Sequence, residues 1–341
     1  GAWHGEDWTH NDCFEDIATP VRVAVTISGD GVHVDFEGTG PQMRGFKNSS
    51  AANTQSAVYM AIKSFFDAPL PHNEGVFRPI TIAMPEGSAV NPRPPAPTSN
   101  GTIAIAQHII HAVWQALGQA DPDLACAGWG RSVHPTMSGH TPETDHRYIV
   151  FHFQTMPGGG ALKGRDGFAS VGHLSSLGGL TIPNIEPYEQ LYPITFERQE
   201  LRCDGGGPGT FRGGPGIDYA VRMHEACTMH FRSEGIGPSS GFGANHGQPG
   251  EGGFMEVTET DGTRDVPPPF STRNYGACIY HALSPGGGGW GAPMERPVAL
   301  VLEDVLGGLV SVEAARDLYG VVMSEDGQEA DRTATTQLRA V

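Results

Sequence analysis

Four histidines and two carboxylates gather in one stretch of the chain. They are His134, His140, His146 and His152, with Glu143 and Asp145 between them. Neutral imidazole and carboxylate are ligands of zinc and manganese, so this stretch is the candidate metal site. Its spacing matches no closed zinc module, and ligands must converge in space as well as in sequence. We therefore expect a surface segment without metal, with His134, His140 and His146 as the candidates if one binds.

A pair of glutamates offers acid–base chemistry. Glu186 and Glu189 are three residues apart. A carboxyl group acts as a general acid or base when burial moves its pKa toward neutrality. The sequence does not show burial, so both residues are candidate catalytic groups whose surroundings decide their role.

Charged residues beside glycine turns are candidates for catalysis and substrate binding. Asp204 and Arg212 bracket a glycine-rich segment, and Arg165 and Asp166 lie between two other glycines. An arginine near backbone N–H groups can clamp a carboxylate or phosphate. The alternative is an ion pair that only locks loops together. The sequence predicts catalytic roles for Asp204 and Arg212 and substrate contacts for Arg165 and Asp166, with loop locking as the alternative.

Glycine-rich segments recur at residues 157–161, 204–216 and 285–291. The second has seven glycines and two prolines. Glycine adopts φ > 0 and lets the backbone approach another surface closely. We therefore expect a shaped loop at residues 204–216, with Gly206 and Gly207 as candidate substrate-binding positions.

Familiar nucleotide and nucleophile motifs are missing from the sequence. It has neither a P-loop nor a G-x-G-x-x-G fingerprint, which argues against nucleotide binding by either loop. Residues 237–241 match G-x-S-x-G by letter, but a nucleophile elbow needs a strand before it and a helix after it. Gly243 and Asn245 follow, so we expect no serine nucleophile.

The elements that position these residues change in character along the chain. Periodicity predicts a hairpin over residues 21–36, helices over 49–66 and 103–117, and a strand over 77–84. Short alternating runs follow from about Tyr148, with a further strand at 298–301 and a helix at 312–319 that Ser311 caps and Gly320 ends. The fold class is α+β, with a mixed α/β region at 1–147 and a β-rich region with glycine-rich loops and a short C-terminal helix at 148–341.

Composition excludes several partners. The net charge is −17 over 341 residues, which argues against nucleic acid and against an anionic membrane surface. No apolar run is long enough to span a bilayer. Five cysteines, odd in number and without a C-x-x-C pair, are typical of reduced thiols, so we expect a cytoplasmic protein.

Eight short motifs in chain order resemble the hydantoinase B/oxoprolinase family. They are GAWHGED at 1–7, VDFEGTGPQ at 34–42, PHNEGVFRPI at 71–80, PEGSAVN at 85–91, EPYEQLYP at 186–193, DGGGPGTFRGG at 204–214, PGGGGWGAP at 285–293 and AARDLYGVV at 314–322. Each is short, but their common order along nearly the whole chain is specific.

The resemblance implies a component of a two-part, ATP-using enzyme. In such enzymes an actin-like hydantoinase A partner phosphorylates the substrate, and the B component completes hydrolysis of a cyclic amide such as a hydantoin, 5-oxoproline or lactam. ATP and magnesium are then expected on the partner, with zinc or manganese possible in the complex. Relatives include N-methylhydantoinase B, 5-oxoprolinase and the subunits of acetone and acetophenone carboxylases.

Three functions stay open on this resemblance. The leading one is a cyclic-amide hydrolase component whose glycine-loop amides stabilise a developing oxyanion. The alternatives are a component of a ketone carboxylase, which shares the same machinery, and a non-catalytic assembly subunit.

Family members ordinarily carry a further N-terminal region of about 200 residues, which is domain-sized. It contains an Asn-Asp-Pro stretch and a His-x-x-Asp element associated with metal binding, and neither has a counterpart here. We expect this chain to act beside a chain that carries that region. We also expect this chain to expose apolar surface where that N-terminal region would pack against it, for example on the helix at 103–117.

Overall fold

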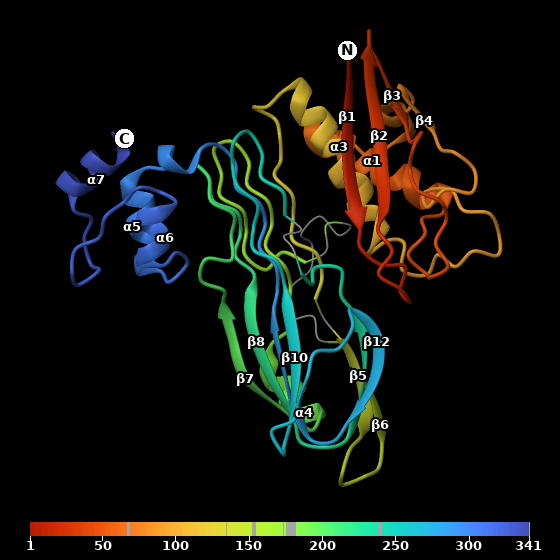
Figure 1. Cartoon of the computed structure of the whole chain (residues 1–341). Coiled ribbons are helices and arrows are strands. Elements are labelled where there is room, and N and C mark those ends of the chain that lie inside the picture. The colour runs from red at the N-terminus through yellow and green to blue at the C-terminus, as the bar shows by residue number, and fades with distance from the viewer. Residues whose placement is uncertain are drawn as a thin grey trace. The chain divides into compact units, whose positions relative to one another are not determined.

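The computed structural model describes residues 1–66, 69–133, 135–151, 155–172, 174, 182–237 and 241–340 (Figure 1). The chain divides into two compact units, Gly1–Cys126 and Ala127–Val341. Both helices and strands are abundant, which confirms the α+β class. The division expected after residue 147 falls at the start of strand β6 (Arg147–Phe151) and stays a prediction. Among the described residues, no helix is long and apolar enough to cross a membrane.

A four-stranded sheet forms the base of the first unit, in the order β1-β2-β3-β4. Its strands are β1 (Ala2–Thr9), β2 (Thr19–Ser28), β3 (Gly31–Asp35) and β4 (Ile80–Ala83). β1, β2 and β3 pair antiparallel, and β4 pairs parallel to β3. Gly29 has φ of +60° in the tight connection from β2 to β3, a conformation that favours glycine. The predicted hairpin is confirmed.

Helices pack beside this sheet. They are α1 (Ala51–Phe66), the short α2 (Glu74–Phe77) and α3 (Ile105–Ala120). α3 contacts β1, β2 and α1, and nearly all its side chains are buried. Gly5 of β1 permits this close approach, because a Cβ there would lie 1.9 Å from the carbonyl oxygen of Ala112. The two long helices are confirmed, but the expected exposed apolar face of α3 is wrong, because the elements around it bury that face.

A β-sandwich forms the core of the second unit (Figure 1). One sheet has the order β11-β10-β13-β8-β7, and the other has the order β12-β9-β5-β6. Besides β6, the strands are β5 (Pro135–His140), β7 (Ile194–Leu201), β8 (Ile217–Met223), β9 (Cys227–Arg232), β10 (Phe254–Glu259), β11 (Arg264–Asp265), β12 (Phe270–Tyr275) and β13 (Cys278–Leu283). Side chains from both sheets meet in one buried core, which includes Met137, Tyr219, Phe231 and Val257.

Glycine-rich segments run side by side beyond the sandwich strands and bond to one another through their main chains (Figure 1). The N–H groups of residues 286–289 donate in turn to the carbonyls of Glu251, Gly214, Gly128 and Gln248. The N–H groups of Gly286 and Gly289 therefore donate to the segment at 241–251. Those of Gly287 and Gly288 donate to the segments at 204–216 and 127–130. This three-residue period is that of a polyproline II helix, which has no internal hydrogen bonds. We call this assembly, made of residues 127–130, 157–161, 204–216, 241–251 and 284–291, the glycine bundle.

Close packing, and not φ, requires glycine at residues 205–216 of this bundle. None of the glycines between residues 205 and 216 has a positive φ, whereas Asp204 has φ of +55°. A Cβ on Gly213 would lie 1.9 Å from the carbonyl oxygen of Gly287. The expected close backbone approach is therefore confirmed, and the expected need for φ > 0 is wrong at these positions.

Two helices of the second unit differ from the sequence-based prediction. The expected strand at 298–301 is wrong, because this segment opens α5 (Val298–Leu306) after Pro297. A short apolar run fits a strand or a buried helix turn equally well, and the residues after it decide between them. α4 (Ile185–Leu191) precedes β7, in a region where no helix was expected.

The remaining helices close the chain. The predicted helix at 312–319 is confirmed as α6 (Val312–Asp317), where the Ser311 hydroxyl accepts the N–H of Ala314 at 3.0 Å. Gly320 follows it with φ of +64°. α7 (Arg332–Arg339) forms the end of the described chain, and a 3₁₀ turn (Pro293–Glu295) leads into α5.

Candidate functional site

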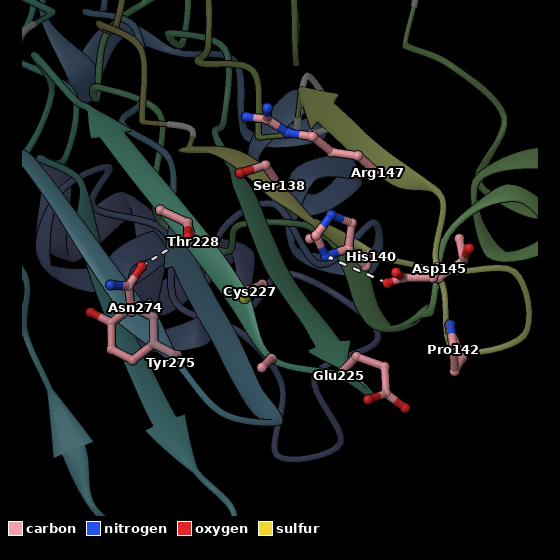
Figure 2. Close-up of a pocket in the computed structure, with 13 residues that line it drawn as sticks. Ser138, His140, Pro142, Asp145, Arg147, Glu225, Cys227, Thr228, Asn274 and Tyr275 are labelled. Atoms are coloured by element: carbon pink, nitrogen blue, oxygen red, sulfur yellow. Dashed lines mark hydrogen bonds and ion pairs between the residues drawn. The ribbon is translucent and has the colours of Figure 1, made fainter.

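A polar pocket of about 640 Å³ opens beside the β5–β6 hairpin of the second unit (Figure 2). His140 of β5 and Arg147 of β6 line it, and Glu225 reaches it from the connection between β8 and β9. Figure 2 shows Thr228 and Asn274 on one side of the pocket, joined by a hydrogen bond of 2.8 Å. Walls that carry both charges and neutral polar groups suit a small polar ligand.

The predicted histidines do not converge in the described residues. His140 Nδ1 lies 3.9 Å from Asp145 Oδ1, and both side chains are largely exposed (Figure 2). His146 is exposed as well, whereas His134 and His152 lie outside the residues that the structure describes. Within those residues, no three His, Cys, Asp or Glu side chains are placed to hold one metal ion.

α4 carries the predicted acid–base pair. Asn184 caps the helix by accepting the N–H of Glu186 at 3.2 Å. Glu189 accepts the N–H of Phe196 at 2.7 Å, which ties α4 to β7. Both glutamates are exposed, whereas an acid–base role requires a surrounding that shifts the pKa. Their catalytic role stays a prediction.

The charged residues of two glycine segments join one network with α5. Arg212 Nη2 lies 3.1 Å from Asp304 Oδ1, and Arg296 Nη2 lies 2.8 Å from Asp304 Oδ2. Arg296 also binds both carboxylate oxygens of Asp166, at 2.8 and 2.7 Å. Two arginines and two aspartates thus balance their charges in a largely buried place. This is the loop-locking arrangement, and the catalytic role of Arg212 and the substrate-binding role of Asp166 stay predictions.

The network also sets the charge state of Asp166. Burial raises the pKa of its carboxyl group. The hydrogen bond and charge of Arg296, together with the charge of Arg212, lower that pKa by more than burial raises it. The net result is a pKa below the usual value for aspartate. Asp166 therefore stays ionised and is suited to holding arginines, not to donating a proton.

The two other predicted loop residues have different surroundings. Asp204 Oδ1 accepts the N–H of Ser311 at 2.8 Å, and its own N–H donates to the carbonyl of Leu309, so it holds the start of α6. Arg165 is exposed and its guanidinium stacks on the Phe168 ring at 4.1 Å. Of the four predicted charged loop residues, Arg165 is the most open to solvent: Asp166 and Asp204 are partly exposed and Arg212 is buried.

Gly206 and Gly207 lie inside the glycine bundle. A Cβ on Gly206 would lie 2.1 Å from the carbonyl oxygen of Gly213, and one on Gly207 would lie 2.4 Å from that of Gln248. The N–H of Gly207 already donates to the carbonyl of Gly287 at 2.8 Å. An oxyanion would have to displace this bond, and the substrate-binding role of both glycines stays a prediction.

Sequence reasoning missed a buried carboxylate–histidine cluster in the first unit. The Nδ1 atoms of His108 and His111 each lie 3.2 Å from Asp7 Oδ2, and both imidazoles are fully buried. The N–H of Trp8 donates to Asp7 Oδ1 at 2.8 Å. The spacing i, i+3 on one helix places both histidines on one face and was visible in the sequence. The sequence did not reveal that Asp7, about a hundred positions earlier, is the carboxylate partner of both histidines.

The sequence profile of the hydantoinase B/oxoprolinase family matches residues 1–293, so the chain belongs to this family. It is 35% identical to the beta subunit of caprolactamase from Pseudomonas jessenii, over 94% of this chain and 56% of that protein. It is 31% identical to the B component of a putative D-/L-hydantoinase from Pseudomonas sp. (strain NS671), over 94% of this chain and 55% of that protein. The chain thus spans slightly more than half the length of these relatives, whose names identify them as subunits.

Two solved structures share the fold over 100% of this chain. The ATP-dependent caprolactamase from Pseudomonas jessenii has a TM-score of 0.86 and 31% identity, and the match covers 60% of its chain. Nucleotide-free acetone carboxylase has a TM-score of 0.85 and 21% identity, and the match covers 52% of its chain. The second likeness shows the fold alone.

Proposed function

We propose that this chain is a component of an ATP-dependent enzyme that hydrolyses a cyclic amide. The observation that carries the proposal is the 35% identity to the caprolactamase beta subunit over 94% of the chain. The hydantoinase and 5-oxoprolinase relatives act, by their names, on other compounds of the same class. All these substrates contain a ring amide, whose resonance-stabilised C–N bond resists attack by water. The proposed substrate class is therefore the cyclic amide and not one compound.

The proposal assigns the use of ATP to a separate hydantoinase A-type subunit. The sequence offers no P-loop and no G-x-G-x-x-G fingerprint to hold a nucleotide. A phosphoryl group placed on the amide oxygen by the partner makes the ring carbon electrophilic, and water attacks that carbon. The ring C–N bond then breaks as the hydroxyl proton passes to the ring nitrogen, which leaves an open-chain amine with an acyl phosphate. A second water hydrolyses the acyl phosphate to a carboxylate and phosphate. The proposed enzyme also includes the rest of the B component, which the longer relatives carry.

Arg165 is the residue of this chain that we assign to the activated substrate. Within the described residues its guanidinium makes no ion pair, and the exposed side chain stacks on the Phe168 ring. A guanidinium is suited to a phosphate or carboxylate, which it binds through two parallel hydrogen bonds. Arg212 and Arg296, by contrast, already bind carboxylates of this chain.

Reconstitution tests the function. The chain is combined with a hydantoinase A-type subunit and a chain that carries the rest of the B component. Phosphate release from ATP and ring opening are then measured with caprolactam, hydantoin and 5-oxoproline, and in parallel with acetone plus bicarbonate. We expect ATP hydrolysis coupled to ring opening for at least one amide, and only when this chain is present. Turnover of the ketone alone would support the carboxylase alternative, and full activity without this chain would contradict the proposal.

Two variants test the role of Arg165 in the same assay. Removing a charge-assisted hydrogen bond costs about 1.5–3 kcal/mol, so Arg165→Ala should lower kcat/KM about 10- to 100-fold. Lys163→Ala removes a neighbouring exposed cation and is the matched control. Equal activity of both variants would contradict the assignment of Arg165 without affecting the proposed reaction.

A further inference from the structure

Two connections cross between the sheets of the sandwich at the same end. Residues 224–226 join β8 to β9, and residues 276–277 join β12 to β13. The strand register places Cys227 opposite Tyr275 and Cys278 opposite Met223. The two connections therefore lie side by side, and each delivers a cysteine as the first residue of the strand that follows it.

The two thiols meet in the core just beneath these exposed connections. Cys227 and Cys278 are 4% and 2% exposed, and both belong to the buried core between the two sheets. The neighbouring thiol of Cys278 lowers the pKa of Cys227 despite its burial, whereas Cys227 and burial both raise the pKa of Cys278. Cys227 is therefore the thiol that ionises first, and a thiolate is the reactive form of cysteine.

The polar pocket beside the β5–β6 hairpin reaches Cys227. Cys227 lines the pocket together with Glu225, Ala226 and Tyr275, so a small solute in the pocket lies against its strand (Figure 2). Cys278 lies behind Cys227 on the opposite sheet. Cys227 thus lies at the wall of the pocket, and Cys278 lies on the sheet behind it.

We propose that Cys227 and Cys278 are a redox-active dithiol, which hydrogen peroxide oxidises to a disulfide that links the two sheets. The Cys227 thiolate attacks one peroxide oxygen, the O–O bond breaks, and hydroxide leaves and takes up a proton to become water. The Cys278 thiol then attacks the sulfur of the Cys227 sulfenic acid, and the S–O bond breaks with loss of a second water. Two thiols and one peroxide give one disulfide and two waters, and a dithiol reductant reverses the reaction.

Peptide mapping of the full chain tests the proposal. The protein is treated with hydrogen peroxide, its remaining thiols are alkylated in denaturant, and it is digested with trypsin. Cys227 falls in the peptide 223–232, Cys278 in 274–316 and the exposed Cys203 in 203–212. We expect a disulfide-linked pair of the first two peptides, loss of two of the five free thiols, and full reversal by dithiothreitol. The cross-link should also raise the Tm, because it restricts the unfolded chain.

Two variants separate the roles of the cysteines. In Cys278→Ser the sulfenic acid at Cys227 has no partner, so dimedone should label the peptide 223–232. In Cys227→Ser dimedone should leave the peptide 274–316 unlabelled, and Cys203→Ser, the matched control, should still lose two thiols. The proposal fails if the wild type keeps five thiols, or if the cross-link joins other cysteines. The wild-type mapping decides this even where a variant folds poorly.

Discussion

Asp166 and Arg296 form a two-point ion pair across 130 positions of the chain. Arg296 Nη1 lies 2.8 Å from Asp166 Oδ1, and Nη2 lies 2.7 Å from Oδ2. The same guanidinium reaches Asp304 of α5, which in turn binds Arg212 of the glycine bundle. Through this network α5 is joined to the bundle by charge.

Replacing Arg296 should destabilise the second unit. Arg296→Ala leaves Asp166 without its ion pair in a largely buried place, and breaking a buried pair costs about 3–5 kcal/mol. Arg296→Lys keeps the charge but loses the planar fork, so an intermediate loss is expected. Urea unfolding followed by circular dichroism measures both. Arg316→Ala, which breaks an exposed pair with Asp317, should unfold like wild type, and equal stability of Arg296→Ala and Arg316→Ala would contradict the prediction.

The same network predicts a loss of stability in acid. The pKa of Asp166 is lower in the folded protein than in the unfolded chain, where aspartate titrates near pH 4. Its contribution is therefore present above about pH 4 and is lost as the pH falls through the folded pKa. Asp166→Asn should be less stable than wild type at pH 7, and the difference should shrink below about pH 4. A difference that stays constant from pH 7 to pH 3 would show that Asp166 does not titrate as argued.

A single methyl group should disturb the glycine bundle. In Gly213→Ala the new Cβ meets the carbonyl oxygen of Gly287 at 1.9 Å, and a backbone atom cannot rotate away as a side chain does. Overpacking of this kind costs about 1–3 kcal/mol. Gly276→Ala is the control, because its Cβ would lie 3.6 Å from Glu259 Oε2, at ordinary contact distance. Thermal unfolding should separate the two variants, and identical Tm values would mean that the bundle yields easily.

Two buried tyrosines should respond oppositely to removal of the hydroxyl group. Tyr148 Oη has no hydrogen-bond partner among the described residues, and burial raises its pKa to about 12. Tyr148→Phe should therefore be as stable as wild type or up to about 1 kcal/mol more stable. Tyr275 donates to Asp265 Oδ2 at 2.6 Å, so Tyr275→Phe should lose about 1.5–3 kcal/mol. Chemical unfolding tests the pair, and a large loss in Tyr148→Phe would reveal a partner for that hydroxyl.

Metal analysis tests the histidine segment. With His140 and Asp145 exposed and 3.9 Å apart, we expect far less than one zinc or manganese ion per chain after purification without chelator. A ratio near one that His140→Ala abolishes would overturn this expectation. If His111→Ala abolished it instead, the metal would belong to the Asp7 cluster of the first unit.

Local patterns predicted much of the fold, and distant partners account for most of what they missed. The hairpin at Gly29, the helix α3 and the Ser311 cap each follow from residues a few positions apart. The apolar run at the start of α5 did not reveal its helix, because its length fits both elements.

The same distinction holds for the candidate site. Arg212 and Asp166 stood out beside glycines, but their partners Arg296 and Asp304 carry no local signal that links them. The i, i+3 pair of His108 and His111 was visible, whereas Asp7 was not recognisable as its partner. Glycine density revealed the bundle but could not tell whether φ or packing required it, because that depends on which carbonyls lie opposite each Cα.

Beside the apolar core of its sandwich, the second unit has the glycine bundle, a second packed region that is built from peptide groups and not from apolar side chains. Exposure of apolar surface raises the heat capacity on unfolding, and exposure of polar surface lowers it. The bundle and the sandwich therefore contribute heat-capacity changes of opposite sign. The stability of the second unit should curve less with temperature than that of an all-apolar core of its size, and cold, which weakens the hydrophobic effect, should loosen the sandwich before the bundle.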